Sequence, residues 1–330
     1  MLSTVFARLS FLCACLVVCL HGDMLDQTGT VAHVVQEAIR ALYRCALPLF
    51  FFMSGYWFVG HVDEEGWWRR ALRKRVRTLG VPYVVFISLS LLFYVVRDVV
   101  LTQAPLLGGA TGVLRHLGFD LRHPTGDNMW YLRCLFLFFL VTPLVLPLVR
   151  RSACATGGMA VASALIPLVT PKSSEGIFWY FGFNAYGFAL FLLGMRLRWT
   201  NLAFGTRLRP VAWCTAGLVA GLCGLVGAVA CPNVFAVAFI WQPLMFAGLL
   251  AAAAVLPIPK AWGAYSFPIY ALHWFFLATV TVALRAHVGV FNSFFVNGIL
   301  VVGAILFAIG VAKALKAGAP RVHQLVFGNR

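Results

Sequence analysis

The sequence predicts an all-α integral membrane protein, a bundle of about ten transmembrane helices with both termini in the cytoplasm. Hydrophobic residues make up 62% of the 330 residues and charged residues only 11%. A soluble domain is usually about half apolar and a quarter charged. Ten apolar runs divide the chain, and the basic residues between them fall mostly on alternate loops. This composition excludes a cytosolic enzyme, a secreted disulfide scaffold and a disordered protein.

Each apolar run is bounded by charged or turn residues. A membrane-spanning helix needs about 20 apolar residues, so ten spans occupy most of the chain and leave only short loops. We therefore expect one transmembrane domain over residues 1–330 and no separate soluble domain. The runs lie near residues 5–21, 46–60, 79–96, 129–149, 154–170, 178–195, 211–230, 234–256, 263–284 and 293–312.

The placement of charges supports the number of helices. With the N-terminus inside, 18 of the 26 Lys and Arg and three of the ten Asp and Glu lie on the inner side, a net charge of +15. The other eight basic and seven acidic residues leave +1 outside. Removing one helix would scramble this division, which follows the positive-inside rule. The total charge of +16 is thus attributed to topology and acidic lipid, and not to nucleic acid.

The first run and the cysteines add two expectations. No small-x-small cleavage site follows Leu20, so we interpret the first run as a retained span and not as a signal peptide. The nine cysteines lie mostly inside apolar runs and form no CxxC pair. We therefore expect neither a metal site nor a disulfide framework.

Polar residues at the outer ends of the first two runs are candidates for a site. His21 ends the first run, where a histidine can take up a proton near neutral pH; an interfacial histidine that only faces water is the alternative. Arg44 precedes the second run and should lie near His21. Ser54 and Gly55 are small residues inside an aromatic stretch, where they would let helices approach closely.

A block of six basic residues falls within nine positions, from Arg69 to Arg77. It is larger than topology requires. Guanidinium groups bind phosphate bidentately, which favours a phosphorylated cofactor. The alternative is an anchor on acidic lipid, worth roughly 1 kcal/mol per residue.

Two later segments place ionisable groups within apolar runs. Arg133 follows Trp130 and Tyr131 just inside the fourth run, where an ionisable group usually faces a cavity or a partner. Tyr270 and His273 are three residues apart and hence on one helix face. A hydrogen-bonded structural histidine is as consistent with the position of His273 as a catalytic one. The chain has no P-loop, GxGxxG, HExxH or GxSxG element, which excludes the common nucleotide-driven pumps, zinc proteases and serine hydrolases.

Taken in chain order, these segments resemble the acyltransferase 3 family of bacterial integral membrane acyltransferases. The family's opening helix, which ends in a histidine, is similar to VFARLSFLCACLVVCLHG. A frequent tail of the family is similar to AGAPRVHQLVFGNR. Five further segments are similar to family segments in the same order: YRCALPLFFFMSGYWF, LRKRVRTLGVPYVVF, MWYLRCLFLFFLVTPLV, FALFLLGMRLR and AYSFPIYALH.

The resemblance implies a reaction and a location. The family moves an acyl group, often acetyl, from cytoplasmic acyl-CoA to a hydroxyl of an envelope or exported glycan or lipid-linked sugar, at the inner membrane and without a metal. His21 matches the family histidine that acts as general base toward the acceptor hydroxyl. Arg44 and Arg133 would hold the sugar or stabilise the developing oxyanion.

The remaining site residues implied by the resemblance form two groups. The phosphates of CoA are expected at the basic segment, on Arg73, Lys74, Arg75 and Arg77. The cavity is expected to be lined by Ser54, Trp130, Tyr131, Tyr270 and His273.

The sequence departs from the family pattern in the first helix. An arginine usually lies eleven residues before the histidine, and this position is Ser10 here. Arg8 lies thirteen residues before His21 and, at about 100° per residue, on nearly the opposite helix face, so we leave it outside the site. Two alternatives stay open: a non-catalytic transporter or flippase, and a ligand-sensing membrane module of the same fold. An internal repeat would favour the transporter, and the sequence shows none.

Overall fold

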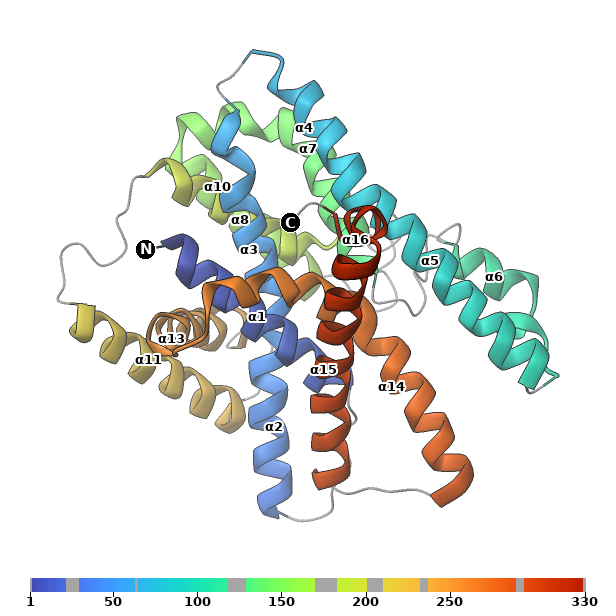
Figure 1. Cartoon of the computed structure of the whole chain (residues 1–330). Helices are drawn as coiled ribbons and strands as arrows, with labels where there is room; N and C mark the ends of the chain where they lie inside the picture. The colour runs from blue at the N-terminus through green and yellow to red at the C-terminus, as the bar shows by residue number, and fades with distance from the viewer. Residues whose placement is uncertain are drawn as a thin grey trace. The chain divides into compact units, whose positions relative to one another are not determined.

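The structure is a computed structural model. It describes residues 2–21, 30–62, 65–101, 103–117, 129–169, 183–200, 210–231, 237–288 and 294–328. Within these ranges every regular element is helical and no strand occurs (Figure 1). This agrees with the predicted all-α class. The tail residues Asn329 and Arg330 and the acidic pair Asp63 and Glu64 lie outside the described residues.

Five described helices are long and apolar enough to cross a membrane: Leu2–His21, Trp67–Val100, Trp130–Arg151, Val211–Ala230 and Val296–Gly318. Two shorter apolar helices cover Ala153–Ile166 and Phe239–Val255. The protein is therefore a membrane protein. The count of ten spans and the cytoplasmic position of both termini stay predictions.

The chain forms two compact units, and each is described by itself. The first comprises Met1–Phe50 and Asn201–Ala314, and the second comprises Phe51–Thr200 and Leu315–Arg330. The expectation of a single domain over residues 1–330 stays a prediction.

Helix α1 lies at the centre of the first unit. It packs against α2, α13, η7 and α14, and its buried residues Phe11, Ala14 and Val18 share a core with α14 and α15. The strongly amphipathic α2 was not predicted, because its mixed composition gives no apolar run. The helices of this unit are α1 (Leu2–His21), α2 (Thr30–Arg44), α11 (Pro210–Ala230), η6 (Val237–Trp241), α13 (Gln242–Val255), η7 (Lys260–Tyr265), α14 (Ser266–Val288) and α15 (Phe294–Gly318).

Helices α11 and α13 touch through glycines. A Cβ atom added to Gly221 would lie 2.5 Å from the Cα atom of Gly248, and one added to Gly217 would lie 2.7 Å from the Ala251 Cβ atom. Lipid tails are as apolar as helix side chains, so the hydrophobic effect does not drive helices together in a membrane. Small residues let the two backbones approach closely, and the resulting van der Waals packing stabilises the contact. This contact therefore fixes the distance between the two helices.

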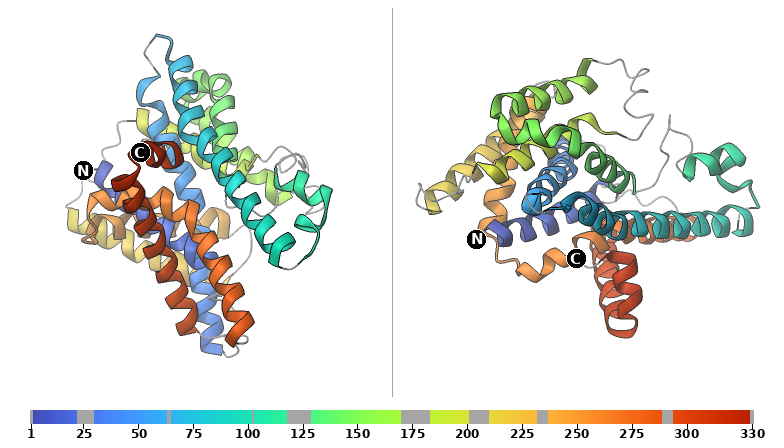
Figure 2. Two further views of the ribbon diagram at one scale, coloured as in Figure 1. Left: turned by 45° about the vertical axis from the view of Figure 1, so that its right-hand side comes forward. Right: turned by 90° about the horizontal axis from the view of Figure 1, so that it is seen from above.

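A long rod of helix dominates the second unit. Elements α4 (Trp67–Arg75), η2 (Val76–Gly80), α5 (Val81–Tyr94) and η3 (Val95–Leu101) follow one another without a break, as all three views show (Figures 1 and 2). The predicted span near 79–96 is thus the middle of a longer helix, and the basic block is its first part. The short C-terminal helix α16 (Pro320–Phe327) packs on α5.

The rest of the second unit is built on aromatic side chains. Helix α3 crosses α10 at backbone contact, because Gly55 lies against the Phe191 carbonyl and Gly194 against the Phe52 carbonyl. Phe138 of α7 packs on Phe191. The other helices of this unit are α3 (Ala46–Phe58), which begins in the first unit, η1 (Val59–His61), η4 (Leu106–Gly108), α6 (Ala110–His116), α7 (Trp130–Arg151), α8 (Ala153–Val169) and α10 (Ala185–Trp199).

The glycine contact generates a first prediction. Gly221→Ala should lower the free energy of unfolding by about 1–3 kcal/mol, because the new methyl group meets backbone that can yield only by separating the helices. Thermal unfolding in detergent measures this. Gly310→Ala is the matched control, since nothing lies within 4 Å of its added Cβ atom; equal destabilisation of both variants would contradict the prediction.

Candidate functional site

Two predicted histidines lie side by side in the first unit. His21 is the last residue of α1 and is exposed, whereas His273 on α14 is completely buried. Their ring centroids are 5.2 Å apart with an interplanar angle of 36°. The structure therefore brings together a solvent-accessible imidazole and a buried one, from segments 252 residues apart in the chain.

The hydrogen bonding of His273 defines its tautomer. Its Nδ1 atom lies 2.9 Å from the Ile269 carbonyl oxygen one turn earlier. A carbonyl oxygen can only accept, so Nδ1 carries the hydrogen and donates it. The Nε2 atom of the neutral ring then bears the lone pair, and it is buried with no hydrogen-bond partner among the described residues. Tyr270, also predicted for the cavity, is buried one turn before His273.

Arg44 is the last residue of α2, the helix that packs against α1. Its side chain is exposed, and its backbone carbonyl accepts a hydrogen bond of 3.1 Å from the buried side-chain amide of Gln242. Gln242 thus ties the end of α2 to the start of α13 and leaves the Arg44 guanidinium at the surface.

The predicted residues of α3 and α7 meet in the second unit. The hydroxyls of Ser54 and Tyr131 are 3.1 Å apart. The Phe51 ring contacts the Tyr131 ring at 4.7 Å and the Trp130 ring at 6.4 Å. The neighbouring Gly55 lies against the backbone of Phe191 on α10 and not against α7. These side chains form a polar spot within an otherwise aromatic surrounding.

Arg133 lies one turn along α7 from Trp130. Its Nε atom is buried and has no hydrogen-bond partner among the described residues. An ionisable group within an apolar helix is costly and usually faces a cavity or a partner. The buried Nε atom of Arg133 is therefore a donor that a ligand could use.

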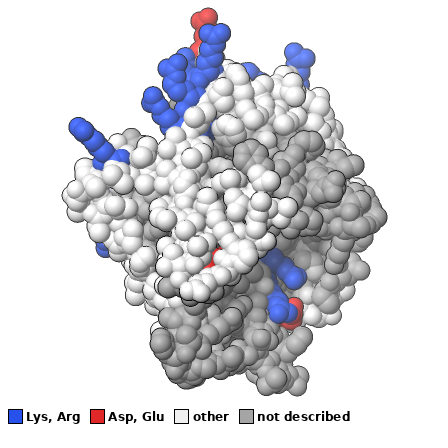
Figure 3. Space-filling model, turned by 90° about the vertical axis from the view of Figure 1, so that its right-hand side faces the viewer, with Lys and Arg blue, Asp and Glu red and all other residues white. Residues whose placement is uncertain are grey.

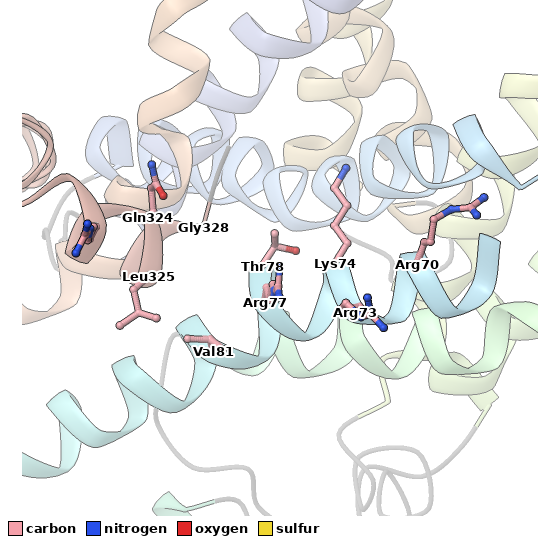
Figure 4. Close-up of a pocket in the computed structure, with 10 residues that line it drawn as sticks. Arg70, Arg73, Lys74, Arg77, Thr78, Val81, Gln324, Leu325 and Gly328 are labelled. Atoms are coloured by element: carbon pink, nitrogen blue, oxygen red, sulfur yellow. The ribbon is translucent and has the colours of Figure 1, made fainter. Parts of the chain in front are cut away.

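The basic segment lies on the first part of the long helix. Figure 3 shows Lys and Arg side chains gathered over α4. A cavity of about 620 Å³ lies between this helix and α16 (Figure 4). Three of the four predicted phosphate-binding residues line it, namely Arg73, Lys74 and Arg77.

Arg75, the fourth predicted residue, points elsewhere. Its guanidinium lies 5.7 Å from the centre of the Phe58 ring. It lines a second cavity of about 330 Å³ with Trp57, Phe58 and Trp67. Arg70 and Lys74 line both cavities.

Several residues that line the two cavities were not predicted from the sequence. Arg321 and Gln324 of α16 line the first cavity, and only the family-like tail gave a signal for them. The aromatic residues of the second cavity, Trp57, Phe58 and Trp67, precede the basic block, and no motif marks them as ligand-binding residues.

Arg8 has a different role in the structure. Its guanidinium donates hydrogen bonds to the carbonyl oxygens of Ile258 at 2.6 Å and Ala254 at 3.1 Å, at the end of α13. The Ser10 hydroxyl donates to the Phe6 carbonyl of its own helix at 2.8 Å. Arg8 therefore secures helix packing, which agrees with leaving it outside the site.

The comparisons with known proteins identify the family. The Acyltransferase domain family, acyltransferase 3, matches residues 9–313. The chain belongs to this family. No curated protein and no solved structure matches the chain. The match confirms the predicted family and makes the protein a membrane acyltransferase. The tail segment AGAPRVHQLVFGNR lies beyond the matched residues, so its resemblance stays a prediction. All nine cysteines are free, and no group of three His, Cys, Asp or Glu in the described ranges could hold a metal ion.

The orphaned guanidinium atom generates a second prediction. Arg133→Met should leave the free energy of unfolding unchanged or raise it by up to about 1 kcal/mol, because it removes a buried Nε atom that has no hydrogen-bond partner among the described residues. Thermal or denaturant unfolding in detergent measures this.

Arg196 is the matched control for Arg133. It also lies on an apolar helix, but its Nη1 atom donates to the carbonyl oxygens of Val149 at 3.0 Å and Arg150 at 2.9 Å. Arg196→Met should therefore cost about 1–3 kcal/mol. Equal destabilisation by both substitutions would show that Arg133 has a structural partner.

Proposed function

We propose that this acyltransferase moves an acyl group, which we take to be acetyl, from cytoplasmic acyl-CoA to a hydroxyl of an envelope or exported glycan. It would act as a multi-pass protein of the inner membrane, with membrane lipid and a glycan or lipid-linked sugar as its partners and no metal. The observation that carries the proposal is the pair formed by exposed His21 and buried His273. One imidazole of this pair can reach a substrate, and the other can orient it.

His21 is proposed as the general base. As the acceptor hydroxyl attacks the thioester carbonyl carbon, its proton passes to the His21 imidazole. The C–O bond forms, the carbonyl oxygen becomes an oxyanion, and the collapse of the tetrahedral intermediate breaks the C–S bond. The proton then passes from the imidazolium to the departing CoA sulfur, so that CoA leaves as a thiol and His21 is neutral again.

His273 is proposed as a positioning residue for His21. Its Nδ1–H group is committed to the Ile269 carbonyl, so its Nε2 lone pair is oriented by the helix and not by solvent. A neighbouring lone pair favours the His21 tautomer that presents N–H to it and leaves the other His21 nitrogen basic. It also stabilises the imidazolium that forms during the attack.

The other predicted residues bind and orient. The cavities at the basic segment suit the phosphates of CoA, because arginine forks bind phosphate bidentately. Arg133, with its buried unpartnered Nε atom, and exposed Arg44 would hold the sugar or the oxyanion. Ser54, Trp130 and Tyr131 would supply the polar and aromatic wall that such a sugar contacts.

A third prediction tests the base. His21→Ala should lower acyl transfer at least about 100-fold, the contribution typical of a general base, while acetyl-CoA binding stays intact because His21 lines neither cavity at the basic segment. The measurement uses purified protein in nanodiscs, radiolabelled acetyl-CoA and a mixture of envelope glycans. Leu20→Ala, a neighbouring change at the same helix end, is the control.

Other outcomes of this assay separate the alternatives. Label transfer that persists in His21→Ala would contradict the assignment of the base. Movement of a substrate without consumption of acetyl-CoA would favour a transporter. Binding of acetyl-CoA without turnover on any glycan would favour a sensing module or a different acceptor.

A fourth prediction concerns His273. His273→Phe keeps a ring in the buried position but removes the Nε2 atom of the ring that lies beside the His21 ring, so kcat should fall about 10-fold or more while the KM for acetyl-CoA changes little. The pH profile of kcat should shift as well, because the His21 imidazole loses its partner. If the pH profile of kcat stayed unchanged and activity fell only in proportion to the amount of folded protein, His273 would contribute to packing alone.

A further inference from the structure

We infer that the C-terminal helix α16 is part of the nucleotide-binding site: Arg321 and Gln324 complete a cradle for the phosphates of acyl-CoA, and the adjoining aromatic cavity takes the adenine ring. The inference rests on the proposed function, which supplies the ligand. It adds the helix α16 and the aromatic cavity to the basic segment that was predicted from the sequence.

The first cavity is built from two elements far apart in the sequence. Arg70, Arg73, Lys74 and Arg77 lie along the long helix (Figure 4), and Arg321 and Gln324 of α16 line the same cavity. The volume of about 620 Å³ lies within the range of about 300–1,000 Å³ that is usual for ligand pockets. A phosphate held here would meet donors from two sides.

The charges of this cavity are not neutralised within the described part of the chain. Arg73, Lys74, Arg77 and Arg321 all have exposed side chains, and none of them forms an ion pair with a described acidic residue; the ion pairs present there are Arg40–Glu37 and Arg97–Asp98. Like charges that converge on one cavity repel one another. An anionic ligand bound in the cavity would reduce this repulsion.

Packing holds α16 in place beside the cavity. Phe327 is only 2% exposed, and its ring lies 6.2 Å from the ring of Phe86 on α5. Gly328 ends the helix with a φ of +70°, a conformation that glycine adopts at little cost. Arg321 and Gln324 thus lie on a helix whose position is fixed by packing, so the cavity between α16 and the long helix is preformed.

The second cavity supplies a place for a planar ring. Trp57, Phe58 and Trp67 line a volume of about 330 Å³, and the Trp57 side chain is 46% exposed. Nucleobases stack on such aromatic side chains with little regard to sequence or edge. Arg70 and Lys74 border both cavities, so one molecule with a base and adjacent phosphates can occupy the two together.

This second cavity decides between two sources of phosphate. A lipid headgroup and a nucleotide share the phosphate chemistry of the cradle. A phospholipid brings no planar ring to the compartment beside it, whereas CoA brings adenine. The observations therefore favour the nucleotide.

The test measures binding and does not need turnover. The full-length protein is placed in nanodiscs of phosphatidylcholine alone, and the Kd values for CoA and for adenosine 3′,5′-bisphosphate are determined by equilibrium dialysis. The second probe carries the adenine ring and phosphates but no thioester. Arg321→Gln combined with Gln324→Ala should weaken both ligands about tenfold or more, since hydrogen bonds to charged groups are lost.

Three further variants make the test specific. Arg321→Lys should restore most of the affinity, because the charge returns. Trp57→Leu should weaken both ligands as well, because both carry adenine. Arg151→Gln is the control for charge, since Arg151 is an exposed residue at the end of α7 that lines neither cavity; its Kd values should stay within about twofold of wild type.

The outcomes separate this inference from the proposed function. Wild-type protein that binds neither CoA nor acetyl-CoA would overturn both. Wild-type protein that binds CoA equally well with and without the α16 substitutions would overturn the role of α16 and leave the proposed function standing. If the variant with Arg321→Gln and Gln324→Ala lost binding to phosphatidylglycerol in mixed-lipid nanodiscs but kept the wild-type Kd for CoA, the cradle would be a lipid anchor. This result would overturn the inference too.

Discussion

Charged and polar groups within apolar helices must be satisfied by another group, and this constraint orders the whole structure. Arg8 donates to carbonyls at the end of α13, Arg196 to carbonyls at the end of α7, and Arg198 to the Tyr56 hydroxyl at 3.1 Å. These arginines join helices. Arg133, Arg196 and His273 each keep one buried nitrogen without a hydrogen-bond partner in the described structure, and Arg196 is held through its Nη1 atom instead. A buried atom of that kind is costly unless a substrate or a neighbouring side chain uses it.

The same contrast separates the two kinds of chemistry in the protein. At the basic segment, the proposed recognition of the donor would depend on full charges that water can reach, with the aromatic rings beside them as a surface for stacking. At the histidine pair, the important group is a neutral nitrogen lone pair held by a helix carbonyl. The proposed reaction needs both, because it would bind a multiply charged donor and still move a proton at a nearly uncharged centre.

Much of the helical structure was predictable, because long apolar runs leave few alternatives in lipid. The site was only partly predictable. The spacing of Tyr270 and His273 places them on one face, and the isolated charge of Arg133 marks it as unusual. The contact between His21 and His273 depends on how α1 packs against α14, and the Ser54–Tyr131 pair depends on the approach of α3 to α7. Neither packing leaves a period or motif in the sequence. Helix α2 and the docking of α16 were missed because amphipathic segments of mixed composition do not stand out from loops.

The hydrogen bonds of Arg8 have a mechanical consequence for His21 at the other end of α1. The first half of the helix is pinned, since Arg8 is bonded to the end of α13 and Gly263 of η7 lies against the backbone of Ala7. The thirteen residues from Arg8 to His21 span about 20 Å at 1.5 Å per residue. Over that lever arm, a tilt of about 6° at the pinned end would displace the imidazole by about 2 Å, whereas misplacements of about 1 Å already cost about 100-fold in rate. The position of the His21 imidazole is thus set at the far end of its helix.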